Sequence, residues 1–317
     1  MPDYFVYGGC LRSELTFPEL APAQGQAPNW TLRVGGLSRD DGAVVLSDVE
    51  LSRTCRIRLT CGDGWFRYSN SCAGSFEIFA NGSRILFEPA KCADLDAARA
   101  DFVSRVLLYC VDHTSITWLQ GSAVRIGGTA VAFVGPPGSG KSTIALAMAR
   151  GGASHICDDT VAVDSVGCSL IRSSDEIIRL HADSKMKLAS TVSPLRRESD
   201  GKYVMTQRSA TEPSEPDGTK NTRCPLGSIY VLNPRERTRG GLGISKRLVS
   251  PTRAIGILLR HVKLGPLVLR EDPARLTQHL RAIVGSVPVY ELSLPRDWSA
   301  LDAVTDRIGS WHANRAS

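Results

Sequence analysis

The sequence predicts an α/β protein in which a P-loop domain follows a smaller, β-rich N-terminal domain. A glycine-rich motif at 135–143 lies between a β-branched apolar run at 129–134 and a run of good helix formers at 143–150. Residues 1–92 instead contain short strand-like runs separated by Gly-Gly, Gly-Asp-Gly and Asn-Gly turns. We therefore expect an accessory or substrate-binding domain at 1–110 and a P-loop domain at 111–317.

Composition limits the class of protein. The chain has 317 residues and 42% hydrophobic content, which is enough to build two modest hydrophobic cores. No apolar run approaches the roughly 18 residues of a membrane-spanning helix, and the start of the chain lacks the pattern of a secretory signal. The nine cysteines are scattered without a C-x-x-C pair, which argues against a disulfide framework or a zinc site. We expect a cytoplasmic protein that does not bind a membrane.

Charge is unevenly distributed along the chain. Residues 1–110 hold 11 Lys and Arg against 13 Asp and Glu, whereas residues 111–317 hold 27 against 19. The basic excess lies in the half that contains the glycine-rich loop, where it would favour a polyphosphate or an acidic partner; a merely solvated basic surface is the alternative. Aromatic residues make up only 6% of the chain and there is no lysine-rich tail, so we expect no nucleic-acid binding.

The N-terminal region has the spacing of a β domain. Strands are predicted at 4–7, 30–34 and 56–60 because each apolar run ends at a glycine-containing turn. The runs at 75–80 and 83–88 flank an Asn-Gly dipeptide, which is a strong hairpin signal.

The remaining predicted elements follow in order along the chain. A helix at 94–109 precedes a second predicted hairpin, whose strands at 118–126 and 129–134 flank Gly-Gly. Residues 190–225 are rich in Pro, Ser, Asp and Gly, and predict a long loop that could act as a lid or contact substrate. Further strands are predicted at 226–232 and 287–292, and further helices at 250–262, 274–284 and 298–311.

The motif at 135–143 has the form G-x-x-x-x-G-K-[ST] of a Walker A loop. Its glycines let consecutive N–H groups turn inward, and these groups together with the helix N-terminus hold phosphate oxygens. Lys141 would reach the β- and γ-phosphates, and the Ser142 hydroxyl would bind Mg²⁺. The predicted nucleotide-binding residues are Gly135, Pro136, Pro137, Gly138, Ser139, Gly140, Lys141, Ser142 and Thr143.

A pair of carboxylates follows the next predicted strand. Asp158 and Asp159 come 17 and 18 residues after Lys141, between apolar runs at 153–157 and 160–163. In P-loop proteins an acid at the end of a neighbouring strand approaches the Mg²⁺ on the phosphates. Two adjacent acids can divide the work, one binding metal and the other accepting a proton from an attacking hydroxyl. An Asp-Asp turn or helix cap is the structural alternative.

The arrangement from residue 118 to 163 resembles the catalytic domain of the HPr serine kinase/phosphorylase family and its related serine kinases. The resemblance is carried by GPPGSGKST at 135–143 and ICDDTVAV at 156–163, which stand at the family's spacing. It implies the bent, mixed sheet shared with phosphoenolpyruvate carboxykinases. It also implies ATP as phosphate donor, Mg²⁺ as cofactor and a homo-oligomeric assembly.

The resemblance also implies roles for single residues. Lys141 and Ser142 match the phosphate and Mg²⁺ contacts, Asp158 matches the general base, and Asp159 matches its metal-binding neighbour. The family carries His-Gly where this chain has Gln120-Gly121, and its phosphorylase-loop signature is not visible here.

The expected activity is phosphoryl transfer to a serine hydroxyl of a protein or of a ribosomally made peptide, since the related kinases include those that modify lasso peptide precursors. Two alternatives stay open. One is a kinase for a small molecule such as free serine, and the other is a nucleotide-sensing regulatory protein without catalysis. The acid pair favours an enzyme, because a sensor needs no base.

Overall fold

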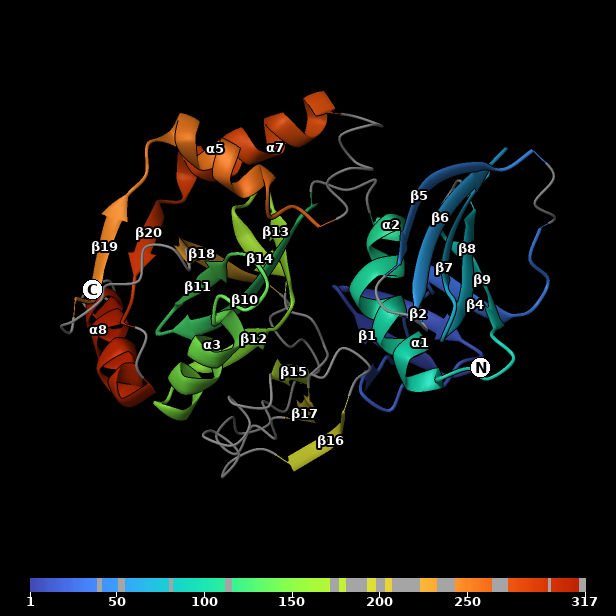
Figure 1. Cartoon of the computed structure of the whole chain (residues 1–317), viewed down its shortest axis with the longest axis horizontal. Coiled ribbons are helices and arrows are strands. Elements are labelled where there is room, and N and C mark those ends of the chain that lie inside the picture. The colour runs from blue at the N-terminus through green and yellow to red at the C-terminus, as the bar shows by residue number, and fades with distance from the viewer. Residues whose placement is uncertain are drawn as a thin grey trace. The chain divides into compact units, whose positions relative to one another are not determined.

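A computed structural model divides the chain into two compact units, Met1–Thr114 and Ser115–Ser317 (Figure 1). Both units are built mainly of strands with a smaller number of helices, so the predicted mixed α/β class is confirmed. The structure describes residues 1–38, 42–50, 55–79, 82–111, 116–171, 177–180, 193–197, 203–206, 223–232, 243–263, 273–295 and 298–313.

The first unit contains a nine-stranded sheet in the order β3-β1-β2-β4-β9-β8-β7-β6-β5. Its second half, from β9 to β5, is an antiparallel meander, whereas β4 lies parallel to both of its neighbours. The predicted hairpin of β8 and β9 is confirmed, although pairing stops at Ile78 and Ile85 and the connection is longer than two residues. The bounds are β1 Asp3–Val6, β2 Gly9–Ser13, β3 Ala21–Pro22, β4 Trp30–Val34, β5 Val44–Glu50, β6 Arg56–Gly62, β7 Trp65–Asn70, β8 Gly74–Phe79 and β9 Arg84–Pro89.

The helix predicted at 94–109 is present, but its middle turn is wider than an α-helix. Asp94 caps it by accepting from two backbone N–H groups of the first turn, each at 3.0 Å. The chain then passes from an α-helix into a π-helical segment and back. These segments are α1 Leu95–Asp101, the π-helix Phe102–Val106, and α2 Leu107–Val111.

Aromatic packing holds this helix to the sheet. Phe102 packs at ring-centroid distances of 5.2 Å from Phe17 and 5.6 Å from Phe76, and Phe76 stacks on Phe87 at 4.4 Å. All four side chains are fully buried. Each such ring buries a large apolar area, so this cluster forms the centre of the first unit's core.

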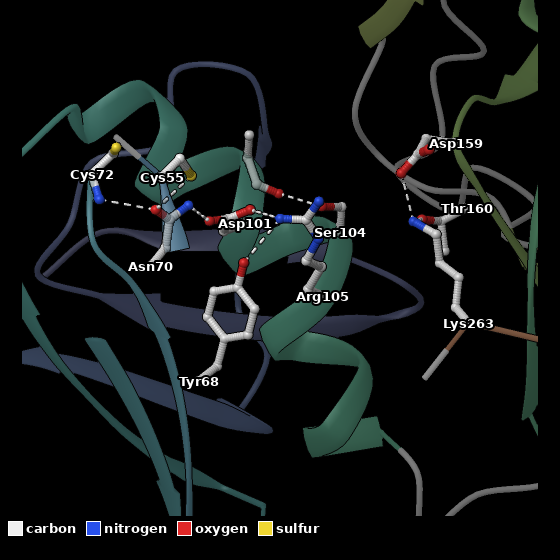
Figure 2. Close-up of polar contacts among 11 residues, drawn as sticks. Cys55, Tyr68, Asn70, Cys72, Asp101, Ser104, Arg105, Asp159, Thr160 and Lys263 are labelled. Atoms are coloured by element: carbon white, nitrogen blue, oxygen red, sulfur yellow. Dashed lines mark hydrogen bonds and ion pairs between the residues drawn. The ribbon is translucent and has the colours of Figure 1, made fainter. Parts of the chain in front are cut away.

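A buried polar network also joins the helix to the sheet (Figure 2). Asp101 accepts from the Asn70 amide at 2.7 Å and from the Arg105 guanidinium, which also donates to the Tyr68 hydroxyl at 2.9 Å. Burial, together with the nearby Asp101 carboxylate, raises the pKa of Tyr68, so its phenol stays protonated. The network satisfies groups that would be costly to bury alone.

The second unit contains an eight-stranded sheet that closes on itself. β10 pairs with β11, β11 with β18, β18 with β14, β14 with β13, and β13 again with β10. These five strands form a closed ring. It closes because β10 pairs with β13 along its first half and with β11 along its second, while β18 pairs first with β14 and then with β11. The register between β18 and β11 shifts at Gly227. The bounds are β10 Ile116–Ile126, β11 Thr129–Val134, β12 Ser154–Cys157, β13 Thr160–Asp164, β14 Ser169–Ile171, β18 Arg223–Leu232, β19 Ser245–Leu248 and β20 Val289–Ser293.

Helices cover both faces of the strands that lead to the glycine-rich loop. The side chains of β11 alternate, so that Phe133 packs with α3 and α8 whereas Ala132 packs with α5 and α7. No helix in the described ranges is long and apolar enough to cross a bilayer. The bounds are α3 Lys141–Arg150, α5 Pro251–Leu259, α7 Pro273–Ser286 and α8 Leu301–Ala313.

The polar segment from 190 to 225 is not a continuous loop. It contains β16 (Ser193–Arg197) and β17 (Tyr203–Thr206), which form a small antiparallel sheet with β15 (Ile177–Leu180). The expectation of a loop was therefore wrong for these strands. The rest of the segment up to residue 222 lies outside the described residues.

The ring leaves no room for a side chain at Gly121. A Cβ there would lie 2.6 Å from the Phe133 carbonyl oxygen and 2.9 Å from Val161 Cγ2. We predict that Gly121→Ala destabilises the second unit by about 1–3 kcal/mol, the usual cost of overpacking. Gly256→Ala is the matched control, because among the described residues open space surrounds that position on α5. Thermal unfolding followed by circular dichroism tests this, and equal midpoints for the two variants would contradict it.

Candidate active site

The predicted strand, loop and helix around the glycine-rich motif are confirmed. β11 ends at Val134, the loop occupies 135–140, and α3 begins at Lys141. The first helical hydrogen bond runs from the Ile144 N–H to the Gly140 carbonyl at 3.0 Å. The N–H groups of the first turn therefore face the loop, where they can bind an anion.

Three glycines of the loop are required by its geometry. A Cβ at Gly135 would lie 2.7 Å from the Leu232 carbonyl oxygen, so the loop passes β18 too closely for any side chain. Gly138 and Gly140 have φ values of +75° and +97°, in the left-handed region that side chains disfavour. The sequence motif therefore corresponds to a specific backbone path.

Lys141 lies folded back over its own loop. The residue is only 8% exposed, and its ammonium donates to the Pro136 carbonyl at 3.0 Å. Ser142 and Thr143 follow in the first turn of α3 and are partly buried. A bound phosphate would compete with the Pro136 carbonyl for the ammonium, and the charged acceptor makes the stronger hydrogen bond.

The acid pair, Asp158 and Asp159, lies at a defined position beside β10. β12 and β13 both run antiparallel to β10, with β12 ending opposite Ala123 and β13 beginning opposite Gln120. The acid pair therefore lies opposite the Gly121–Ser122 dipeptide.

Gly121 links the acid pair to the start of the loop. On one edge of β10 it pairs with Val134, the last residue before the loop, and on the other its N–H donates to the Asp159 carbonyl at 3.4 Å. The backbones of Val134 and Asp159 lie on opposite edges of β10, so two strand spacings, or about 10 Å, separate them. The sheet thus fixes the acid pair near the point where the glycine-rich loop begins.

The two acids have different surroundings. Asp158 is buried, 6% exposed, and accepts a 2.5 Å hydrogen bond from the Ser122 hydroxyl. Asp159 has a φ of +63°, which is uncommon for a residue other than glycine and often marks a functional turn. Its side chain is 27% exposed and contacts Lys263, whose ammonium donates to Asp159 Oδ2 at 2.5 Å and to Thr160 Oγ1 at 2.6 Å (Figure 2).

His261 lies close to the same site. Its carbonyl accepts from the Gln120 N–H at 2.7 Å, so the segment after α5 runs beside β10. Burial lowers the pKa of His261, and the positive charges of Lys141 and Arg260 lower it further.

The structure brings Lys141, Ser142 and the acid pair to one region, with three residues that the sequence reasoning missed. Ser122, His261 and Lys263 carry no local motif, and two of them are more than 100 residues from the acid pair along the chain. Ser122 lies on β10 itself, and the bridge between β10 and the segment after α5 brings His261 and Lys263 to the same strand.

Two side chains of the candidate site carry oxygen atoms of the kind that Mg²⁺ takes as ligands. Among the described residues, no three His, Cys, Asp or Glu side chains form a metal cluster. Mg²⁺ does not require one, because it commonly keeps several waters and binds through one or two carboxylates and the substrate phosphates. Ser142 supplies a hydroxyl, and the partly exposed Asp159 supplies a hard carboxylate oxygen.

Comparisons with known proteins find a likeness to solved structures but none to a described family. No protein-family model and no curated protein matches the chain. A structure of the HPr(Ser) kinase/phosphatase from Coxiella burnetii aligns with 63% of this chain and 99% of its own, at 9% sequence identity and a TM-score of 0.31. A likeness this weak does not establish a shared family.

The hydrogen bond from Ser122 to Asp158 is buried and charge-assisted. We predict that Ser122→Ala lowers stability by about 1.5–3 kcal/mol, the usual contribution of such a bond. Ser228→Ala is the control: Ser228 is also buried in this sheet, and its hydroxyl has no partner within the described part of the chain. Thermal unfolding of both variants measures the difference, and equal destabilisation would show that the bond contributes nothing specific.

His261 should make stability depend on pH. Because its pKa is lowered in the folded chain, the unfolded chain binds more protons, and stability falls as pH drops below the unfolded pKa of about 6.5. We predict that the melting temperature of His261→Gln falls less between pH of about 7.5 and 5.5 than that of the natural chain. Parallel melting curves across this range would contradict the prediction.

Proposed function

We propose that this protein is an ATP- and Mg²⁺-dependent kinase that transfers a phosphoryl group to a serine hydroxyl of a protein or ribosomally made peptide. The second unit would then have the phosphoenolpyruvate carboxykinase/HPr kinase-like P-loop fold. The first unit would serve as an accessory or substrate-binding domain.

One observation carries the proposal. Gly121 joins the last residue before the glycine-rich loop to the acid pair on the opposite edge of the same strand. A phosphate-binding loop alone fits many nucleotide-binding proteins, but a buried carboxylate at this position adds a group that can accept a proton. This combination favours phosphoryl transfer over nucleotide sensing.

The loop would bind the transferring phosphoryl group. N–H groups of the loop and of the first turn of α3 would donate to phosphate oxygens, and Lys141 would exchange the Pro136 carbonyl for the β- and γ-phosphates. These donors act on charge that spreads over the γ-phosphoryl oxygens during transfer. Positioning and electrostatic stabilisation would supply most of the rate enhancement.

Asp158 would accept the proton of the serine hydroxyl. As the bond from the serine oxygen to the γ-phosphorus forms, the bond between that phosphorus and the β–γ bridging oxygen breaks, and ADP leaves. The hydroxyl proton passes to the Asp158 carboxylate, which Ser122 orients. Ser142 and Asp159 would hold Mg²⁺, which neutralises charge on the phosphates.

The proposal also covers the phosphate acceptor, the cellular compartment and the oligomeric state. A peptide or protein serine is chosen because the resembled kinases act on such groups. We place the reaction in the cytoplasm, where ATP is abundant and where cysteine thiols stay reduced. We further propose a homo-oligomer, as the resemblance implies.

The decisive test is Asp158→Asn. Asparagine keeps the shape and can still accept from Ser122, but it cannot accept the hydroxyl proton. We predict that transfer from ATP falls by about 10²–10⁴-fold, while the affinity for nucleotide changes little. Asp306→Asn, the same change at an exposed position of α8, is the control. Transfer would be measured by mass spectrometry of HPr, small peptides and free serine incubated with ATP and Mg²⁺.

Each outcome has a separate meaning. Phosphate on a peptide or protein serine that is lost in Asp158→Asn supports the proposal. Phosphate on free serine alone identifies a small-molecule kinase. Nucleotide binding without transfer to any acceptor supports the sensor, and full activity in Asp158→Asn removes Asp158 from the role of base.

A further inference from the structure

The segment that follows α5 occupies a specific place beside β10. Leu119 and Val262 form an antiparallel bridge, and the Lys263 N–H donates to the Trp118 carbonyl at 2.8 Å. β11 leaves this edge of β10 at Val134, where the glycine-rich loop begins. The segment therefore continues the sheet edge at the point from which the loop departs.

Lys263 reaches from this edge to the acid pair on the other side of β10. Its ammonium contacts one carboxylate oxygen of Asp159 and the hydroxyl of Thr160, at 2.5 and 2.6 Å (Figure 2). The Lys263 side chain is only 12% exposed. A cation this buried needs an anionic partner, and the contact with Asp159 supplies one.

The contact bears on the strained residue of the acid pair. Asp159 adopts a φ of +63°, a conformation that persists only where the surroundings impose it. A backbone hydrogen bond from Gly121 and the side-chain contact from Lys263 both act on this residue. The contact with Lys263 is made through Oδ2 of the carboxylate.

Charge gives the contact a second consequence. Two adjacent carboxylates repel each other and would repel the phosphates of a nucleotide. Asp158 accepts from the Ser122 hydroxyl, and Asp159 accepts from the Lys263 ammonium. The Lys263 cation thus lies against the acid to which the proposed function assigns the metal.

We propose that Lys263 is a positioning residue for phosphoryl transfer: it fixes the carboxylate of Asp159 through Oδ2 and offsets its charge, so that a metal–nucleotide complex can bind beside the acid pair. This inference rests on the proposed function. It means that the segment after α5 contributes a side chain to the candidate active site.

Lys263→Met tests the proposal by removing the cation. We predict that the affinity for Mg²⁺ with a non-hydrolysable ATP analogue falls by about 10–100-fold, the range found for groups that support a metal site. Isothermal titration calorimetry measures it without requiring turnover. Lys246→Met is the matched control, since it removes the same charge from β19, on the far side of β20 and β18. Equal affinities in Lys263→Met and the natural chain would overturn the inference.

A double-variant cycle shows whether Lys263 acts through Asp159. In an Asp159→Asn background, Lys263→Met should weaken binding by less than about threefold, because the carboxylate that it positions is gone. An equal loss in both backgrounds would show that Lys263 acts independently of Asp159 and would overturn the proposal. The double variant removes both charges of the Lys263–Asp159 pair, so it also serves if Lys263→Met alone does not fold.

Nucleotide binding and phosphate transfer by the natural chain distinguish a failure of the proposed kinase function from a failure of the role of Lys263. If it binds no nucleotide, or binds it without transferring phosphate, the proposed kinase function fails before any variant is compared. If it binds and transfers normally and Lys263→Met does the same, only the role of Lys263 fails.

Discussion

The second unit depends on close packing around Gly121. β10 has neighbours on both edges there, and a single added carbon would contact the Phe133 carbonyl and the Val161 side chain. The absence of a side chain allows the loop strand and the acid pair to approach the same residue from opposite sides. Because the contacts are with backbone and with a buried strand, neighbouring groups cannot move aside cheaply.

Around this point the structure gathers charged groups that are poorly hydrated. Lys141 and Asp158 are each less than a tenth exposed, and the side chain of Lys263 is only slightly more so. Each is held by a nearby partner: the Pro136 carbonyl, the Ser122 hydroxyl and the Asp159 carboxylate, respectively. In a poorly hydrated site such contacts are stronger than in water, and an incoming phosphate would act on the same groups.

The first unit is stabilised differently. Its helix is held to a nine-stranded sheet by a cluster of aromatic rings and by the network around Asp101. The helix passes through a π-helical segment beside this network, and the buried carboxylate accepts from groups on both the sheet and the helix. The unit therefore has a hydrophobic core and internal polar contacts of its own.

The sequence alone determined the elements whose signals are local. The strand, loop and helix around 135–143, the hairpin that enters it, and the helix capped by Asp94 follow from periodicity, glycine chemistry and capping, which act over a few residues. Only the tertiary structure decided which distant residues join the site. Ser122 and Lys263 meet the acid pair because β10 pairs with β13 and with the segment after α5, and such long-range pairing leaves no pattern in a single sequence.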